Sequence, residues 1–217
     1  MNRLSHQFNP DVIKAFDAYH EEFLNVLYQM QENGIDFHNG AGPKALGITK
    51  KQFDKKCTDL AVALWRKTMR FKDAATENPP QDIVFFEYLS NFSNIFESIE
   101  ITNADMGSDK AYAVLGLTKK DFQYEARFAA HTVLRGFEDY AKGSETGGQA
   151  VFEQVVNCLK LGGLDPETDE PYQLAGHVSR ADLLEKLEGW KKAAAERPHG
   201  HSCCGGHSHA PDPTPSS

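Results

Sequence analysis

Apolar side chains recur every three or four positions along most of this chain, which is the spacing of one face of an α-helix. The first such segment runs from Pro10 to Glu32, and its apolar positions are Val12, Phe16, Tyr19, Phe23, Val26, Leu27 and Met30. Asn33-Gly34 ends it, because glycine adopts the left-handed conformation common after helices. The pattern therefore predicts an amphipathic helix, followed by a loop over residues 39–43.

The same spacing predicts five further helices. They run from Thr49 to Ala75, Asp82 to Ile101, Thr118 to Lys142, Gln149 to Leu161 and Ser179 to Glu196. Thr49 with Gln52, and Ser179 with Asp182, have the spacing of N-terminal caps. Residues 82–101 are rich in Ile, Val and Phe, but their length favours a buried helix over a strand. Strand signals are otherwise nearly absent, so we expect an all-α fold, a compact bundle of about six helices.

Two of the predicted helix starts share a sequence echo. Residues 46–53 recur 69 positions later as residues 115–122, and a weaker version lies at residues 174–183. In the first two copies a leucine and a glycine precede a threonine cap, and a phenylalanine enters the first helical turn. The echo indicates either a duplicated helical unit or separate helix starts that use the same end signals.

Residues 46–53 also resemble the turn and early recognition helix of helix-turn-helix DNA-binding proteins, which implies DNA binding. Two observations weigh against that function. The net charge of -8 at pH 7, with a pI near 5.6, gives no long-range attraction for phosphates. Gly42-Pro43 interrupts the helix that should precede the turn. We therefore do not expect nucleic acid as a partner.

Neither a membrane span nor a secretory signal is predicted. No run of apolar residues approaches 18, and residues 1–6 lack the apolar stretch of a signal peptide. Cys57 and Cys158 stand alone within predicted helices, and Cys203 and Cys204 are adjacent, so the cysteine spacing predicts no disulfide framework. Reduced thiols fit the cytoplasm, and we expect a cytoplasmic protein with no membrane partner.

The composition changes abruptly after residue 197, so we expect a helical domain over 1–197 and a flexible, disordered metal-binding tail over 198–217. Imidazole is largely neutral at pH 7 and a thiol deprotonates readily beside a cation, so both bind metal at little protonation cost. Such ligands suit Ni(II), Zn(II) or Cu, and four of them complete a tetrahedral site. The candidate ligands are His199, His201, Cys203, Cys204, His207 and His209.

Residues 199–209 resemble a short form of the Cys/His-rich nickel-binding tails of bacterial metallochaperones and SlyD-type peptidyl-prolyl isomerases. The resemblance covers about a twentieth of the chain and implies nickel or zinc handling. Because the β-rich isomerase body is not present, isomerase activity is not implied.

A second resemblance concerns the body. Residues 43–51, leading into a helix with Leu64 and Trp65, are similar to the Pro-x-Leu-Gly-x-Thr-Arg-Glu stretch of the non-catalytic E subunit of class III polyhydroxyalkanoate synthases. Lys50 and Lys51 stand where that family has Arg and Glu. The resemblance implies a helical partner that activates or positions a polymerase.

No catalytic motif is legible in the body. The Glu-x-x-His pairs of di-iron bundles are absent, as are a phosphate-binding glycine loop and a nucleophile elbow. His131 is the best candidate for a buried histidine, whereas His20 is expected at the surface. An enzyme would need a pocket lined by groups such as Glu87, Glu125 and His131.

Two classes of function follow from the sequence. In the first, the helical body recognises a client protein through an apolar helix face, and the tail captures, buffers or relays nickel or zinc. In the second, the body is a scaffold or regulatory subunit of a larger enzyme, and the tail is peripheral.

Overall fold

The computed structural model describes residues 10–37, 40–75 and 82–197, and these residues form helices and connecting turns without a strand. The all-α prediction is therefore confirmed. The elements are α1 Pro10–Glu32, α2 Ala41–Ala45, α3 Lys50–Ala75, α4 Asp82–Glu100, α5 Asp109–Tyr112, the 3-10 helix η1 Ala113–Leu115, α6 Lys119–Arg135, α7 Phe137–Gly143, α8 Gln149–Leu161, α9 Glu170–Leu174 and α10 Arg180–Ala195.

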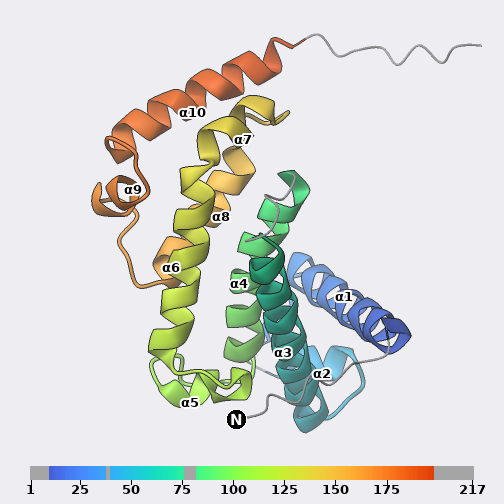
Figure 1. Ribbon diagram of the computed structural model, residues 1–217. Helices are drawn as coiled ribbons and strands as arrows, with labels where there is room; N and C mark the ends of the chain where they lie inside the picture. Colours follow the sequence, from blue (N-terminus) through green and yellow to red (C-terminus); the bar gives the residue numbers. More distant parts are fainter. Residues whose placement is uncertain (1–9, 38–39, 76–81, 198–217) are drawn as a thin grey trace, which may run out of the picture.

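Helix α4 lies at the centre of the molecule, packed against α3, α6 and α8, while α10 crosses the far end of the bundle against α7 (Figure 1). The apolar face of α4 supplies Leu89, Phe92 and Ile95, which are fully buried. The ring of Phe92 contacts Trp65 of α3 and Phe122 of α6, with centroids 6.3 and 5.8 Å apart. The Phe-rich segment therefore forms the core helix that its length predicts.

Five of the six predicted helices match their expected bounds closely, but two expectations were wrong. Residues 41–43, expected to be loop, lie in the short helix α2, which runs from Ala41 to Ala45. The segment from Thr118 to Lys142, expected to be one helix, breaks at Gly136 into α6 and α7. Glycine lowers helix stability at such a position, and the break turns Phe137 into the core, where it is fully buried.

Three short helices, α2, α5 and α9, occupy the same place in three successive helix–short helix–helix units. In each unit a residue with positive φ follows the end of the first long helix within three positions, namely Gly34, Asn103 or Gly163. An aspartate follows two positions later, and a left-handed glycine precedes the next long helix, namely Gly47, Gly116 or Gly176. These positions repeat at offsets of 69 and 60 residues.

The hydrogen bonds of the three units agree as well. The amides of Ile48, Leu117 and His177 donate to carbonyls five residues earlier, at 3.1, 3.3 and 3.0 Å. In the second and third units an aspartate at the start of the short helix, Asp109 or Asp169, accepts from the first amide of the next long helix at 2.9 Å. The matching hydrogen bonds and positive-φ residues lie before the N-caps of α3, α6 and α10. Similar N-cap sequences alone do not explain them, so a repeated helical unit accounts better for the sequence similarity between residues 46–53 and 115–122.

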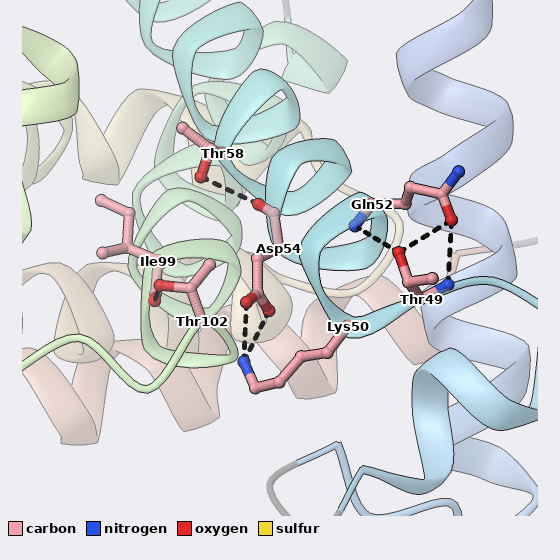
Figure 2. A network of polar contacts seen from close by, with 7 residues as sticks. All are labelled: Thr49, Lys50, Gln52, Asp54, Thr58, Ile99 and Thr102. Atoms are coloured by element: carbon pink, nitrogen blue, oxygen red, sulfur yellow. Dashed lines mark hydrogen bonds and ion pairs between the residues drawn. The ribbon is translucent and has the colours of Figure 1, made fainter.

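Each second long helix begins at a capped residue. Thr49 and Gln52 exchange bonds at the start of α3, with Thr49 N to Gln52 Oε1 2.9 Å and Gln52 N to Thr49 Oγ1 3.3 Å (Figure 2). Asp182 N donates to Ser179 Oγ at 3.1 Å before α10. Both predicted caps are confirmed, and Thr118 forms a capping box with Asp121 in the remaining unit.

Candidate functional site: a groove along α4

The six predicted metal ligands, residues 199, 201, 203, 204, 207 and 209, lie outside the described residues, as does the whole of 198–217. Within residues 10–37, 40–75 and 82–197, no group of three or more His, Cys, Asp or Glu side chains is placed to hold a metal ion. The structure therefore leaves the predicted metal site untested.

The last described residue of the body, Arg197, is held against the end of α7. Its Nη1 donates to the carbonyls of Gly143 and Ser144 at 3.4 Å each, and its Nη2 donates to the carbonyl of Lys142. A guanidinium at a helix C-terminus satisfies free carbonyls and interacts favourably with the helix dipole. The junction between the body and the Cys/His-rich segment is thereby attached to α7.

The two body cysteines are core residues. Cys57 and Cys158 are fully buried and form no disulfide. Burial, with the nearby charge of Asp54, raises the pKa of Cys57 to about 12, and burial raises the pKa of Cys158 further. Thiols held protonated in this way are poor nucleophiles and poor metal ligands.

The groups that a body active site would need have separate partners. Glu125 pairs with Lys72 of α3, and Glu87 pairs with Lys67. His131 is half-buried, and burial together with Arg135 and Arg127 lowers its pKa. None of the described clefts gathers Glu87, Glu125 and His131 along one lining.

A cleft of about 180 Å³ does open between α1, α3 and α4. It is lined by His20, Glu21, Leu24, Tyr28, Ala63, Leu64, Lys67, Glu87, Ser90, Asn91 and Asn94. The side chain of His20 is only 4% exposed, so its expected surface position was wrong. It faces inward because α1 packs across α3. The adjacent Glu21 and Glu22 had suggested an exposed position, because sequence alone does not show this packing.

One end of this cleft carries a three-membered ion cluster. Lys67 Nζ lies 3.3 Å from Glu21 Oε1 of α1 and also pairs with Glu87 of α4. Burial lowers the pKa of Lys67, but the hydrogen bonds and charges of Glu87 and Glu21 outweigh that effect and raise it. Lys67 is therefore charged at neutral pH and links α1, α3 and α4.

The middle of the cleft is lined by uncharged polar side chains. Tyr28 donates its hydroxyl to Asn94 Oδ1 at 2.6 Å, joining α1 to α4. Asn91, one turn earlier on α4, is 5% exposed and lines the same cleft. A carboxamide carries both donors and an acceptor, so Asn91 adds polar groups of both kinds to the lining.

A second and larger cleft, about 490 Å³, continues from the first between α1, α4 and α8. The two share Tyr28, Ser90 and Asn94, and the second adds Gln31, Phe86, Ser93, Phe96, Glu97, Gln154, Asn157, Lys160 and Leu161. The Oε1 atom of Gln154 is buried without a hydrogen-bond partner. We call the two clefts together the α4 groove.

Sequence reasoning missed the α4 groove, although a signal for it exists. Asn94 and Gln154 occupy the same position of the repeated unit, 60 residues apart, and Asn25 is the equivalent residue of α1. A carboxamide recurring at one position of an otherwise apolar helix pattern marks a helix face that is not filled by core packing.

Comparisons of the chain with protein families, with curated proteins and with solved structures found no match. The site must therefore be interpreted from its own chemistry. Among the described helices, none is both long enough and apolar enough to cross a membrane.

Proposed function

We propose that this protein is a metal-binding accessory protein, which buffers nickel or zinc or delivers it to a client protein. The residues proposed to hold the metal are His199, His201, Cys203, Cys204, His207 and His209. The single observation that carries the proposal is the density of these ligands: four imidazoles and two thiols within eleven residues, separated only by Gly and Ser.

The chemistry of the donor set supports this metal assignment. Neutral imidazole and thiolate are borderline and soft ligands, which bind Zn(II), Ni(II) and Cu more strongly than the hard ions Mg(II) and Ca(II). Cys57 and Cys158 are buried within the helices, so the body's own thiols do not add to this donor set.

In this proposal the helical body supplies recognition of the client. The bundle exposes several large apolar side chains, including Tyr124 at 63% and Phe128 at 36% on one face of α6. Exposed aromatic residues are common anchors of protein–protein interfaces. The α6 face is therefore the proposed surface for the client, with the metal-binding segment starting beyond Arg197.

Metal binding is tested with the untagged full-length protein under reducing conditions. Isothermal titration with Ni(II) and Zn(II) should give a sub-micromolar Kd. Replacing Cys203 and Cys204 by Ser and His207 by Ala should weaken binding at least tenfold, while replacing Ser202 and Ser208 by Ala should leave it unchanged. Binding of the intact protein no tighter than that of a generic histidine peptide would overturn the metal function.

A second candidate is a non-catalytic scaffold or regulatory subunit of a larger enzyme, such as a polyhydroxyalkanoate synthase. The exposed aromatic pair Tyr124 and Phe128 on α6 supports this function equally, because the same surface could bind the other subunits of an enzyme complex as well as a client protein. Deleting residues 198–217 separates the two functions: a metallochaperone loses delivery of metal to its client, whereas a scaffold retains its partner.

Helix-turn-helix DNA binding remains the minor alternative. Helix α2, which would precede the turn, has five residues. Phe53, in the first turn of α3, is 1% exposed and points into the core. Both features make this helix pair a poor fit to a major groove.

A further inference from the structure

A cleft of about 410 Å³ opens between the last turns of α10 and the start of α8. Its lining consists of Glu145, Thr146, Gln149, Ala150, Glu153, Lys191 and Ala195. The α7–α8 loop packs directly on α10, because a Cβ on Gly147 would lie only 2.4 Å from the amide nitrogen of Lys191. This backbone contact fixes the two walls relative to one another. We call the hollow the α8–α10 cleft.

The chain that follows the helical body begins at the rim of this cleft. Ala195 lines it, and Arg197 donates Nη1 to the carbonyl of Ser144, the residue before Glu145. An extended chain advances at most about 3.6 Å per residue, so His199 lies within about 7 Å of the Arg197 Cα and His209 within about 43 Å. The first proposed metal ligand therefore starts beside the cleft, and the last has enough chain to return to it.

Two carboxylates give the cleft its hydrogen-bond acceptors. Glu145 and Glu153 are exposed, and neither has an ion-pair partner among the described residues. Glu153 accepts from Gln149 Nε2 through Oε1 at 2.8 Å, which leaves its other oxygen for a second donor. Lys191 also lines the cleft, but its Nζ lies 3.8 Å from Glu188, which is outside the lining. The cleft thus offers two negatively charged acceptors.

Metal-bound imidazoles need acceptors of this kind. A histidine that binds a metal through one ring nitrogen almost always donates the other N–H to a carboxylate, a backbone carbonyl or water, and losing that partner costs about 10–100-fold in metal affinity. Residues 198–211 contain four histidines but no Asp or Glu, and Asp212 is the one acidic residue of 198–217. Carboxylate partners for the other imidazoles must therefore come from outside this segment, and the α8–α10 cleft presents two where the segment begins.

We propose that residues 199–209, once they hold a metal ion, dock in the α8–α10 cleft, where Glu145 and Glu153 accept hydrogen bonds from metal-bound imidazoles. The inference rests on the metal function proposed above and deepens it, because the helical body takes part in holding the metal. A bound cation polarises the imidazole N–H groups and strengthens their hydrogen bonds to carboxylates. The metal-loaded segment is therefore bound more tightly than the metal-free one.

Full-length variants test the role of the two carboxylates. Isothermal titration with Ni(II) under reducing conditions compares the wild type with Glu145→Gln/Glu153→Gln. We expect the double variant to bind Ni(II) at least about fivefold more weakly, because the imidazoles lose charged acceptors. The matched control is Glu170→Gln/Glu185→Gln, which makes the same change in net charge at two exposed residues outside the cleft and should bind as the wild type does. Equal melting temperatures check that both variants fold.

Nuclear magnetic resonance locates the docked segment independently. Zn(II), which is diamagnetic, is added to the full-length protein labelled with nitrogen-15. We expect the amide resonances of residues 145–153 to shift as Zn(II) binds. The same residues should not respond in a full-length variant whose six proposed ligands are replaced by Ala or Ser. That variant separates docking of the segment from direct binding of Zn(II) to the two glutamates.

Failure of this inference can be told apart from failure of the metal function. If the wild type binds Ni(II) no tighter than a generic histidine peptide, both are wrong. If it binds with a sub-micromolar Kd and Glu145→Gln/Glu153→Gln loses less than about fivefold relative to the control, the metal function stands and the docking is wrong. Zn(II) shifts that leave residues 145–153 unaffected, or that persist there after the six ligands are replaced, would also overturn the docking.

Discussion

Lys72 and Glu125 connect the first helical unit to the second through an ion pair, with 2.7 Å between Nζ and Oε2. The side chains are 27% and 17% exposed, and Lys72 Nζ lies 4.7 Å from the ring centroid of Phe128. One lysine of α3 therefore holds both a carboxylate and an aromatic ring of α6.

Breaking this pair should destabilise the protein more than breaking a surface pair. Replacing Glu125 by Gln leaves a largely buried ammonium without its counter-charge, and we expect a loss of about 1–2 kcal/mol in the free energy of unfolding. Urea denaturation followed by circular dichroism measures the change.

The matched control is Asp59→Asn, which breaks the exposed pair between Lys55 and Asp59 within α3. Its expected cost is about 0.3–0.5 kcal/mol. Equal effects of the two substitutions would show that the link between α3 and α6 adds nothing beyond a surface ion pair.

Two glycines on either side of α6 should respond oppositely to alanine. Gly116 has φ 73°, and a Cβ there would meet no atom within 4 Å, so Gly116→Ala isolates the cost of the left-handed backbone. We expect about 1–2 kcal/mol of destabilisation. Gly136, with φ -97°, is open to a Cβ as well, and Gly136→Ala should stabilise by about 0.5–1 kcal/mol. Thermal unfolding compares the two, and an equal response would contradict this explanation.

The capping box before α6 should contribute to stability and to its pH dependence. Thr118→Ala removes the acceptor for Asp121 N, 3.2 Å away, at a cost of about 1 kcal/mol. The Thr118 hydrogen bonds lower the pKa of Asp121. A carboxylate with a lowered native pKa stabilises the fold above its unfolded pKa of about 3.9, and that contribution is lost as the pH falls through the native pKa.

The expected signature is therefore a difference that depends on pH. The wild type and Thr118→Ala should differ most in unfolding free energy near pH 7 and approach one another toward pH 2. A constant difference over the whole range would show that only the hydroxyl, and not the ionised Asp121, stabilises the helix start.

The body thiols should be inert in the folded protein. Burial raises the pKa of Cys57 to about 12 and raises that of Cys158 as well. In a variant with Cys203 and Cys204 replaced by Ser, we expect less than about one tenth of a thiol per chain to react with Ellman's reagent at pH 8, and both to react in 6 M guanidinium. Rapid labelling of the native variant would contradict the buried positions.

Much of the fold was predictable from local sequence signals. Periodic apolar residues located all six long helices, and threonine and serine located the starts of α3, α6 and α10. These signals act within one or two helical turns, so they can be recognised in the sequence without knowing the tertiary packing. The short helices were missed because a single turn has no periodicity, and the break at Gly136 because a lone glycine is tolerated in many helices.

The tertiary structure alone decided the α4 groove. Asn91 and Gln154 lie 63 positions apart and are uncharged, so nothing local indicates that they line connected clefts. They do so because α1, α4 and α8 come together with polar rather than apolar side chains between them. The position of His20 inside the first cleft has the same cause.

The metal-ligand prediction for residues 199–209 rests on their composition alone, and it stays a prediction because these residues lie outside the described part of the chain. The association of Lys72 with Glu125 and of Tyr28 with Asn94 depends instead on helices packing across the bundle. For this protein, local spacing determined the helices and their caps together with the metal-ligand prediction. Packing between distant segments decided which polar groups face one another.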